Sequence, residues 1–204
     1  MATKYPLRTK RKEQTNKKIA RAAQDMFYRK GYDNTTLEEI AEAAGVHVQT
    51  LYRHFASKQE LASAGDNRWF QMFHDRINDP SRTANTFDFW RNWLTRTYIY
   101  LTSDGGEKYR KYISVRHANP LILGQLSEIR ARYEDLLCIS LAKDFDMSPA
   151  GVSKPRLVAG MLIAGSSYTL RRFEVDHTDL VSEATAVIDE VEGMFGHLIK
   201  PRQQ

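Results

Sequence analysis

Residues 36–60, TLEEIAEAAGVHVQTLYRHFASKQE, decide how the rest of the chain is interpreted. Apolar residues recur in its first part at helical spacing, and Thr36 with Glu39 three residues later forms a capping box. A short helix is therefore predicted to begin at about Thr36. Gly45 supplies the backbone freedom that a tight turn needs. The chain then resumes as a second helix from about Val48 to Phe55.

The second helix is predicted to have one buried face and one polar face. Leu51 and Phe55 lie one turn apart and are expected to point inward. The outward set can bind DNA, because Gln pairs with base edges, hydroxyls and His bond phosphates, and Arg does either. Two short helices with such a turn indicate a helix-turn-helix. The outward residues are His47, Gln49, Thr50, Tyr52, Arg53 and His54.

A third helix is predicted to start directly after this pair. Ser57 and Glu60 form a second capping box, which places Lys58 in the first turn. Both a lysine and a helix N-terminus favour a phosphate group. The helix is expected to extend to about Ile77, so its start adjoins the helix-turn-helix and its end reaches the remaining chain.

Residues 31–61, from Gly31-Tyr32 to Leu61, closely resemble the DNA-binding signature of the TetR (tetracycline-repressor) family of bacterial regulators. The resemblance spans roughly Thr9 to Leu61. It implies phosphate or sugar contacts from Thr36, Thr50, Tyr52, His54 and Lys58, and base contacts from Val48, Gln49, Tyr52 and Arg53. His47 completes the predicted DNA-binding set. Two helices that merely pack together, and a packing role for Tyr52 or His54, remain the alternatives.

Charge and cysteine content agree with a nucleic-acid partner. The chain has 204 residues and a net charge of +5, and residues 1–60 hold 12 Lys and Arg against 7 Asp and Glu, so the remainder is neutral. Excess positive charge at the proposed DNA reader suits phosphate binding, although a solvated basic tail would look the same. The single cysteine, Cys138, excludes an internal disulfide framework, and a reducing cytoplasm is expected. No apolar run is long enough to cross a bilayer.

Residues 1–12 form a basic arm that is expected to be disordered when free, because Pro6 discourages an early helix. On DNA the arm could follow the backbone or enter a narrow minor groove; a solubilising tail is the alternative. A helix with an apolar stripe is predicted from about Lys10 to Lys30, ended by Gly31.

The fold class predicted for the whole chain is all-α, with about nine helices. Residues 1–56 are expected to form the arm and the helix-turn-helix domain, and residues 57–204 a larger helical domain that binds a ligand and dimerises. The last two helices, at about 155–173 and 179–199, are predicted to form a four-helix bundle across a two-fold dimer. A hairpin buried within the monomer is the alternative. Helices between these regions are predicted at about 87–101, 109–117 and 120–144.

A small-molecule cavity is expected in the second domain. Eleven of the 22 aromatic residues lie between Trp69 and Tyr112, which is more than one face of each helix can share. The family resemblance also implies a ligand site. An apolar or aromatic compound is expected there, and the nearby arginines would suit an anionic one. Ordinary core packing is the alternative for each ring. The predicted ligand-binding residues are Trp69, Phe73, Trp90, Trp93, Tyr98, Tyr112, Arg116, His117, Gln125, Tyr133 and Tyr168.

Nothing in the sequence indicates catalysis. The six histidines show no metal-ligand spacing with Cys or acids, and no phosphate-cradling glycine loop is present. No metal, cofactor or enzymatic activity is expected. The sequence therefore predicts a homodimeric repressor that is released from a pseudo-palindromic operator by a small effector. Two alternatives stay open: a regulator of the same architecture controlled by a protein partner, and a helical enzyme or carrier.

Overall fold

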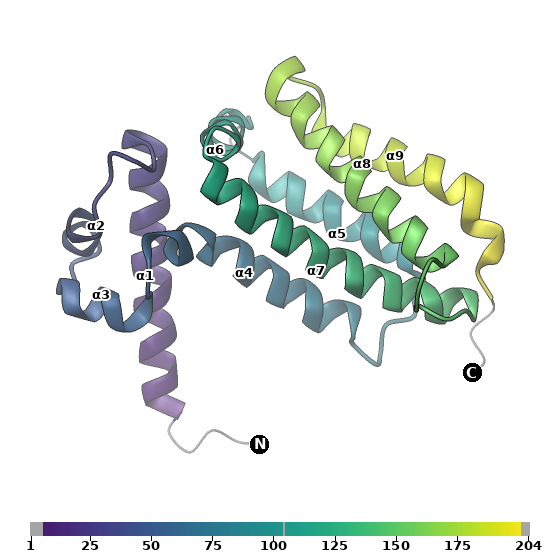
Figure 1. Ribbon diagram of the computed structural model, residues 1–204, viewed down its shortest axis with the longest axis horizontal. Coiled ribbons are helices and arrows are strands. Elements are labelled where there is room, and N and C mark those ends of the chain that lie inside the picture. Colours follow the sequence, from purple (N-terminus) through teal and green to yellow (C-terminus); the bar gives the residue numbers. More distant parts are fainter. Residues whose placement is uncertain (1–5, 104, 201–204) are drawn as a thin grey trace. The chain divides into compact units, whose positions relative to one another are not determined.

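The computed structural model describes residues 6–103 and 105–200, with side chains apart from those of residues 6–9 and 28. Within these ranges the chain is helical and contains no strand (Figure 1). The all-α fold class is therefore confirmed. The helices are α1 (Pro6–Lys30), α2 (Leu37–Ala43), α3 (Val48–His54), α4 (Lys58–Ile77), α5 (Thr86–Leu101), α6 (Glu107–His117), α7 (Pro120–Phe145), α8 (Lys154–Asp176) and α9 (Leu180–Phe195), followed by the 3-10 turn η1 (Gly196–Leu198).

The helices form two compact units. The first, unit 1, consists of Met1–Arg68 and Val115–Gln125, and the second, unit 2, consists of Trp69–Ser114 and Leu126–Gln204. The chain therefore passes from one unit to the other inside α4, α6 and α7. The corner between α6 and α7 belongs to unit 1, although it lies far along the sequence from the helix-turn-helix.

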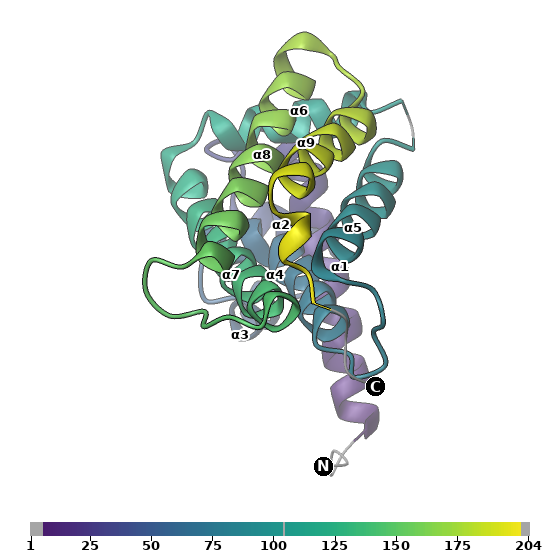
Figure 2. The same cartoon turned by 90° about the vertical axis from the view of Figure 1, so that its right-hand side faces the viewer.

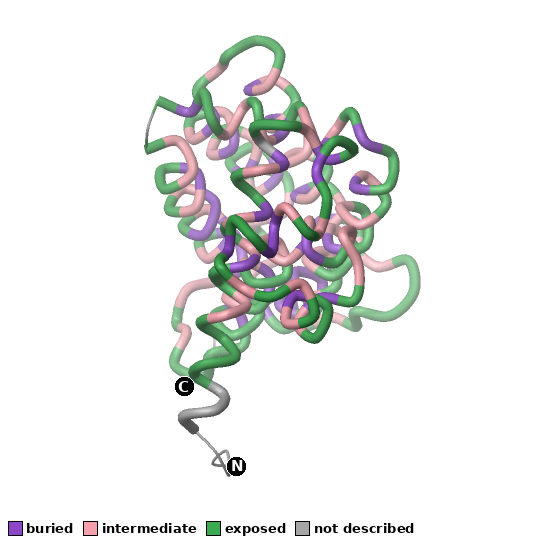
Figure 3. The backbone as a smooth tube through the Cα atoms, turned by 90° about the vertical axis from the view of Figure 1, so that its left-hand side faces the viewer, coloured by how far each residue is buried: buried purple, intermediate pink, exposed green. Residues whose placement is uncertain are grey.

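The first helix begins earlier than predicted. It starts at Pro6 instead of Lys10. Proline has no N–H and a fixed φ, both of which suit the first position of a helix, so Pro6 opens α1 where it was expected to delay it. Residues 10–14 of α1 are exposed, and the segment next to the grey residues is green in Figure 3. The part of the predicted arm at residues 1–5 lies outside the described residues.

The core of unit 1 joins α1, α2, α3 and the start of α4. Ile19, Ile40 and Leu51 are fully buried, and Leu61 of α4 is 2% exposed. Two glycines close the turns of this unit in the left-handed region, Gly31 at φ +82° and Gly45 at φ +58°. A side chain at either position would be strained, so these turns depend on glycine.

The core of unit 2 is formed by the second half of α4 together with α5, α7, α8 and α9. Phe73, Phe87, Leu137 and Val158 are fully buried there. Helix α9 packs on both α5 and α8, and Figure 2 shows α8 and α9 side by side. Helix α9 contributes Ile188 to this core at 1% exposure.

A buried polar network fixes the start of α5 against the end of α7. The Asp144 carboxylate accepts hydrogen bonds from the Thr86 backbone N–H at 2.6 Å and from the Thr86 hydroxyl at 2.5 Å. Ser140 lies 2.7 Å from the Thr86 hydroxyl and accepts a hydrogen bond from Arg82 at 2.8 Å. Thr86, Ser140 and Asp144 are all less than 5% exposed. The acid thus satisfies a helix N-terminus that would otherwise be buried without a partner.

Helix α8 approaches α9 closely at Gly165. A Cβ atom at this position would overlap the Cγ1 methyl of Val187. We expect Gly165→Ala to lower the free energy of unfolding by about 1–3 kcal/mol, because valine is stiff at χ1 and the two helices must separate. Thermal denaturation would measure this change. Gly124→Ala is the control, since no atom lies within 4 Å of its Cβ position; equal effects of the two substitutions would contradict the close approach.

Candidate nucleic-acid interface

The helix-turn-helix is built as its sequence predicts. The Thr36 hydroxyl accepts a hydrogen bond from the Glu39 N–H at 3.2 Å, and the Glu39 carboxylate accepts one from the Thr36 N–H at 3.0 Å. After α2, the Val46 N–H donates to the Ala41 carbonyl at 2.9 Å and closes the turn. Lys30 donates to Glu39 at 2.6 Å and ties α2 to the end of α1. The capping box and the glycine turn therefore determine where α3 begins.

Helix α3 presents its polar face to solvent. Leu51 is fully buried and Phe55 is 6% exposed, whereas Tyr52 is 50% exposed. Gln49 and Arg53 are exposed as well, and Val48 is half-buried at the first turn. This arrangement places groups able to bond base edges on one side of a short helix, as a recognition helix requires.

Two side chains of α3 are held by local hydrogen bonds. The His47 Nδ1 accepts from the Gln49 N–H at 3.3 Å, so this histidine caps the helix. The Arg53 guanidinium donates to the Thr50 hydroxyl at 3.0 Å. Arg53 is thus oriented along the exposed face, and only part of its donor fork is used. The predicted DNA residues Thr36, His47 and Thr50 also act as structural groups in the unbound protein.

His54 braces α3 against α1. Its Nδ1 hydrogen-bonds the Asn16 side-chain oxygen, which can only accept, so Nδ1 carries the proton. Burial lowers the pKa of His54, and the positive charges of Lys12 and Arg53 act in the same direction. The hydrogen bond to Asn16 uses only Nδ1, so the packing role leaves Nε2 available to another partner. The DNA contact of His54 stays a prediction.

Lys58 lies at the start of α4 over an aromatic ring. Its ammonium is 4.4 Å from the centroid of Tyr32 and 3.5 Å from the Asp33 carbonyl. The Glu60 N–H donates to the Ser57 hydroxyl at 3.0 Å, which is one half of the predicted second capping box. The Glu60 carboxylate accepts from the Ala56 N–H at 2.6 Å, one residue before the N–H that the box would use. Lys58 is positioned by Tyr32 and remains close to the N-terminus of a helix.

The corner between α6 and α7 contributes an ion pair to unit 1. Two guanidinium nitrogens of Arg116 donate to the two carboxylate oxygens of Asp66 on α4, one of them at 3.0 Å. The Arg116 side chain is 8% exposed and that of Asp66 is 21% exposed. Nearby, the Asn119 side chain accepts hydrogen bonds from the N–H groups of Leu121 and Ile122 at the start of α7 and donates to Asp33 at 3.5 Å.

Three predicted ligand-binding residues lie at or near this corner and so belong to unit 1, not to unit 2. Arg116, His117 and Gln125 all lie in unit 1, whereas the aromatic members of the set lie in unit 2. Asp66 and Asn16 were not predicted as functional residues. The partners of both pairs are separated by 50 and 38 residues along the chain, so local sequence patterns carry no signal for them.

Five of the predicted ligand-binding residues meet in the core of unit 2. They come from α4, α5 and α7. The Phe73 ring is 5.6 Å from that of Trp90, 5.3 Å from that of Trp93 and 4.7 Å from that of Tyr133. Trp69 joins the edge of this group, 6.0 Å from Trp93. We call Trp69, Phe73, Trp90, Trp93 and Tyr133 the aromatic cluster.

The other three tyrosines of the predicted set lie outside the aromatic cluster. Tyr98 is 4% exposed, and burial raises the pKa of its hydroxyl well above the ordinary value, although a hydrogen bond with Thr169 and the charge of Arg130 oppose the rise. Tyr112 stacks on Tyr109 at 6.2 Å. Tyr168 is 47% exposed on α8. The structure thus brings part of the set together and leaves the rest dispersed.

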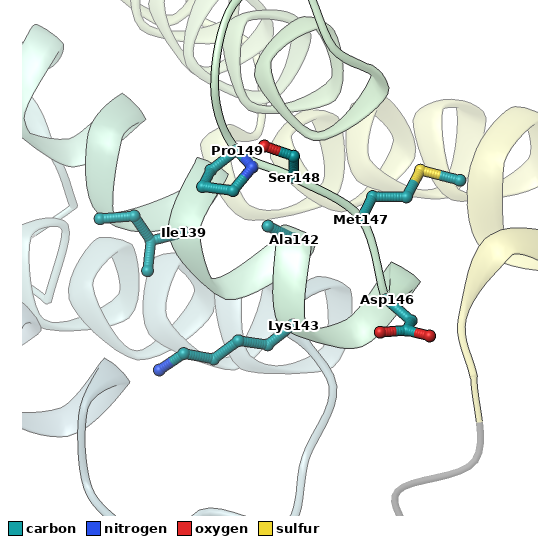
Figure 4. A pocket seen from close by; sticks show the side chains of 7 residues that line it. All are labelled: Ile139, Ala142, Lys143, Asp146, Met147, Ser148 and Pro149. Carbon is teal, nitrogen blue, oxygen red and sulfur yellow. The ribbon is translucent and has the colours of Figure 1, made fainter.

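A hollow of about 580 Å³ lies at the C-terminal end of α7, and its lining is shown in Figure 4. It is wide open to solvent. None of the predicted ligand-binding residues contributes to it. The lining consists of Ile139, Ala142, Lys143, Asp146, Met147, Ser148 and Pro149.

No group of three or more His, Cys, Asp or Glu side chains suited to a metal ion occurs within residues 6–103 and 105–200. Among the helices of the same ranges, none combines the length and apolar character needed to cross a membrane.

A short, exposed polar helix held by a glycine turn on a three-helix core defines a helix-turn-helix protein of the DNA-binding class. Residues 19–64 match the family model described as "Bacterial regulatory proteins, tetR family". The biofilm operon regulator IcaR of Staphylococcus epidermidis is 34% identical over 151 residues, which cover 72% of this chain and 77% of that protein. The chain belongs to the TetR family, as its sequence signature predicts.

Other relatives match over a smaller part of their length. The regulator TtgR of Pseudomonas putida is 47% identical over 127 residues, covering 60% of this chain and 59% of TtgR. TcmR of Streptomyces glaucescens is 46% identical over 56 residues, covering 28% of this chain and 25% of TcmR. The chain thus spans between a quarter and three fifths of these relatives. Their names describe transcriptional regulators.

Solved structures share the fold along most of the chain. SmeT, the repressor of the Stenotrophomonas maltophilia multidrug efflux pump SmeDEF, has a TM-score of 0.67 at 23% identity and covers 88% of this chain and 89% of its own. A SmeT–triclosan complex has a TM-score of 0.70 at 21% identity, covering 94% of this chain and 100% of its own. FadR of Bacillus subtilis in complex with stearoyl-CoA has a TM-score of 0.62 at 19% identity, covering 86% and 96%. At these identities the likeness establishes the fold.

Proposed function

We propose that this protein is a homodimeric transcriptional repressor that binds a pseudo-palindromic DNA operator through α3 and leaves it when a small apolar or aromatic effector binds. In this proposal residues 1–56 read DNA and residues 57–204 bind the effector and dimerise. The observation that carries it is the solvent-facing polar side of α3, with Tyr52 half exposed and Leu51 fully buried. A polar helix face with Gln, Tyr and Arg and no intramolecular cover suits a DNA major groove.

The proposed base and phosphate contacts follow the geometry of α3. Gln49, Tyr52 and Arg53 would approach base edges with Val48, and Thr36, Thr50 and Lys58 would bond phosphates or sugars. Two copies of α3 would enter successive major grooves, about 34–36 Å apart or somewhat more. The exposed basic residues near the start of α1, among them Arg11 and Lys12, would add sequence-independent affinity through phosphate contacts.

Exposed apolar residues on α8 support the proposed dimer. Leu157, Met161 and Tyr168 are 55%, 36% and 47% exposed, and with exposed Ala164 they recur at intervals of four, three and four residues. They therefore form one stripe along the helix. On α9, Met194 is 50% exposed. A stripe of this kind on the outer side of an antiparallel helix pair suits a two-fold four-helix contact.

The proposal that an effector releases the protein from DNA is supported by solved structures of similar fold and by a thermodynamic argument. The SmeT–triclosan and FadR–stearoyl-CoA structures are complexes of proteins of the same fold with small molecules that carry an aromatic or a long acyl part. An effector lowers operator affinity only by binding the DNA-free conformation more tightly, and operator binding must then weaken effector binding by the same factor. The aromatic cluster of unit 2 offers the apolar surroundings that such a compound needs.

Selection of duplexes from a random DNA pool tests the function and supplies an operator for quantitative work. We expect Tyr52→Ala to weaken binding of the selected duplex by about 1–3 kcal/mol, the cost of one specific contact. Fluorescence anisotropy at a fixed salt concentration measures the affinity. Tyr100→Ala is the matched control, since Tyr100 is 67% exposed but lies in unit 2.

A pool that yields no enriched duplex would overturn the proposed function. Equal affinities of the native protein and Tyr52→Ala for an enriched duplex would remove Tyr52 from the interface while leaving DNA binding in place.

A further inference from the structure

The indole N–H of Trp90 is buried without a hydrogen-bond acceptor. Trp90 is 3% exposed, and its Nε1 has no partner among the residues that the structure describes. A buried tryptophan nitrogen usually finds an acceptor, because leaving the donor unpaired costs its full desolvation. The fold thus retains an unfavourable group at a fully enclosed position, and a missing partner is the simplest physical account of it.

The surroundings of Trp90 are apolar on the side of α4 and α7. Its ring lies 5.6 Å from Phe73 with the planes at 83°, and 6.2 Å from Tyr133 with the planes at 56°. Phe73 also contacts Phe89 at 5.5 Å, and Tyr133 contacts Phe70 at 5.1 Å. The neighbouring rings therefore surround the Trp90 indole with apolar, polarisable groups.

The cations near these rings are placed against ring faces. The guanidinium carbon of Arg132 is 3.8 Å from the Phe70 centroid, that of Arg82 is 5.2 Å from Phe89, and that of Arg76 is 5.8 Å from Trp93. Arg82 also bonds Ser140. Among the described residues, these three arginines are engaged with ring faces at the border of the ring group.

We propose that Trp90 Nε1 is the polar anchor of an effector subsite inside the aromatic cluster, and that its ligand is an uncharged, planar aromatic compound bearing a hydrogen-bond acceptor such as a carbonyl or ether oxygen. This inference rests on the proposed function, because it assigns the chemistry of the small effector. A ligand anion or cation is disfavoured here, since burying a charge without a counter-ion is far more costly than burying a neutral acceptor.

The subsite is closed when empty. Ring centroids 4.7–6.2 Å apart leave no room for a further ring between Phe73, Trp90 and Tyr133. A ligand must therefore displace one of the half-buried rings, and Tyr133 on α7 and Trp69 on α4 are the ones that reach the surface of the cluster. Ligand binding then favours a conformation in which α4 and α7 have moved apart within unit 2, which is the differential binding that regulation requires.

Two isosteric probes test the anchor. 2-Acetylnaphthalene carries a carbonyl acceptor, and 2-isopropenylnaphthalene has nearly the same shape without one. We expect calorimetry to show that the native protein binds the ketone about 2- to 12-fold more tightly than the hydrocarbon, the range for one neutral hydrogen bond. Trp90→Phe is expected to abolish this preference, because phenyl has no donor.

Trp93→Phe is the matched control. Trp93 belongs to the same cluster and is 6% exposed, and its nitrogen is not one of the buried groups left without a partner. Trp93→Phe removes the same atoms as Trp90→Phe. We therefore expect it to weaken the binding of both probes and to leave the ratio of their affinities unchanged. Melting curves give a second readout that needs no ligand: Trp90→Phe is expected to lower the melting temperature less than Trp93→Phe, since it also removes an unsatisfied donor.

Several results would overturn the subsite. They are equal affinities of the two probes for the native protein, no binding of either probe, and an unchanged preference in Trp90→Phe. The preference for the ketone would stay unchanged in Trp90→Phe if an ordered water or a ring face accepts the Trp90 N–H in place of the ligand. Enrichment of a DNA duplex by the native protein is measured separately, so the subsite can fail while the proposed repressor function stands.

Discussion

Replacing Asp66 by alanine is expected to destabilise unit 1 by about 3–5 kcal/mol, the usual cost of removing one partner from a buried ion pair. The two Asp66 oxygens take two donors of Arg116, and the arginine side chain is only 8% exposed. Without the carboxylate, this guanidinium keeps its desolvation cost and loses the charge and both hydrogen bonds of Asp66. Arg116→Ala is expected to cost less, because Asp66 is more exposed and water can solvate it.

Hydrogen exchange measured by mass spectrometry checks this prediction without assuming two-state unfolding. Faster exchange is expected in the first half of α4 and in the corner at residues 115–125, both of which belong to unit 1. Asp25→Ala is the control, because its pair with Arg29 is exposed on both sides and contributes little. If Asp66→Ala and Asp25→Ala gave the same exchange profile, the buried pair would not stabilise unit 1. The double variant Asp66→Leu/Arg116→Met is expected to recover most of the loss.

Asp144→Ala is expected to lower the stability of unit 2 by roughly 2–4 kcal/mol. The substitution leaves the Thr86 backbone N–H and hydroxyl without their shared acceptor in a position with almost no solvent, and each unsatisfied group costs about 1–3 kcal/mol. The Thr86 hydroxyl can instead bond Ser140, 2.7 Å away, which limits the total loss of stability. Thr86→Val should therefore cost less than Asp144→Ala, because the backbone N–H keeps its partner.

Urea denaturation followed by far-UV circular dichroism measures this loss. Glu128→Ala on the same helix is the control, since Glu128 is an exposed acid. A loss for Asp144→Ala no larger than that for Glu128→Ala would show that the acid does not hold α5 to α7. Asp144→Asn should lie between the two, because an amide oxygen can still accept one of the hydrogen bonds.

The helix-turn-helix follows from local sequence, which is why it could be predicted closely. A capping box involves four consecutive residues and a glycine turn depends on one residue. The helix starts at Thr36 and Ser57 and the turn at Gly45 can therefore be predicted from neighbouring residues alone. The start of α1 was missed for a local reason as well: Pro6 was interpreted as a barrier although it also suits the first turn of a helix.

Long-range contacts account for what the sequence did not predict. Arg116 is among the predicted effector-binding residues, and its pairing with Asp66 in unit 1 was not predicted. His54 is among the predicted DNA contacts, and its bond to Asn16 on α1 was not predicted either. The functional roles of both residues stay predictions. Such pairs depend on where α6, α4 and α1 pack in three dimensions, and no periodicity encodes that. The five residues of the aromatic cluster could be named because rings are dense at helical spacing in this part of the sequence, and ligand binding by them stays a prediction.

The only thiol in the chain, that of Cys138, is fully buried in unit 2, and burial raises its pKa while the charge of Arg156 partly offsets the rise. A thiolate is the form that reacts with alkylating reagents, so modification requires that the surrounding helices open. The rate at which an alkylating reagent modifies Cys138 therefore reports how often the interior of unit 2 opens. This measurement needs no label and no engineered residue.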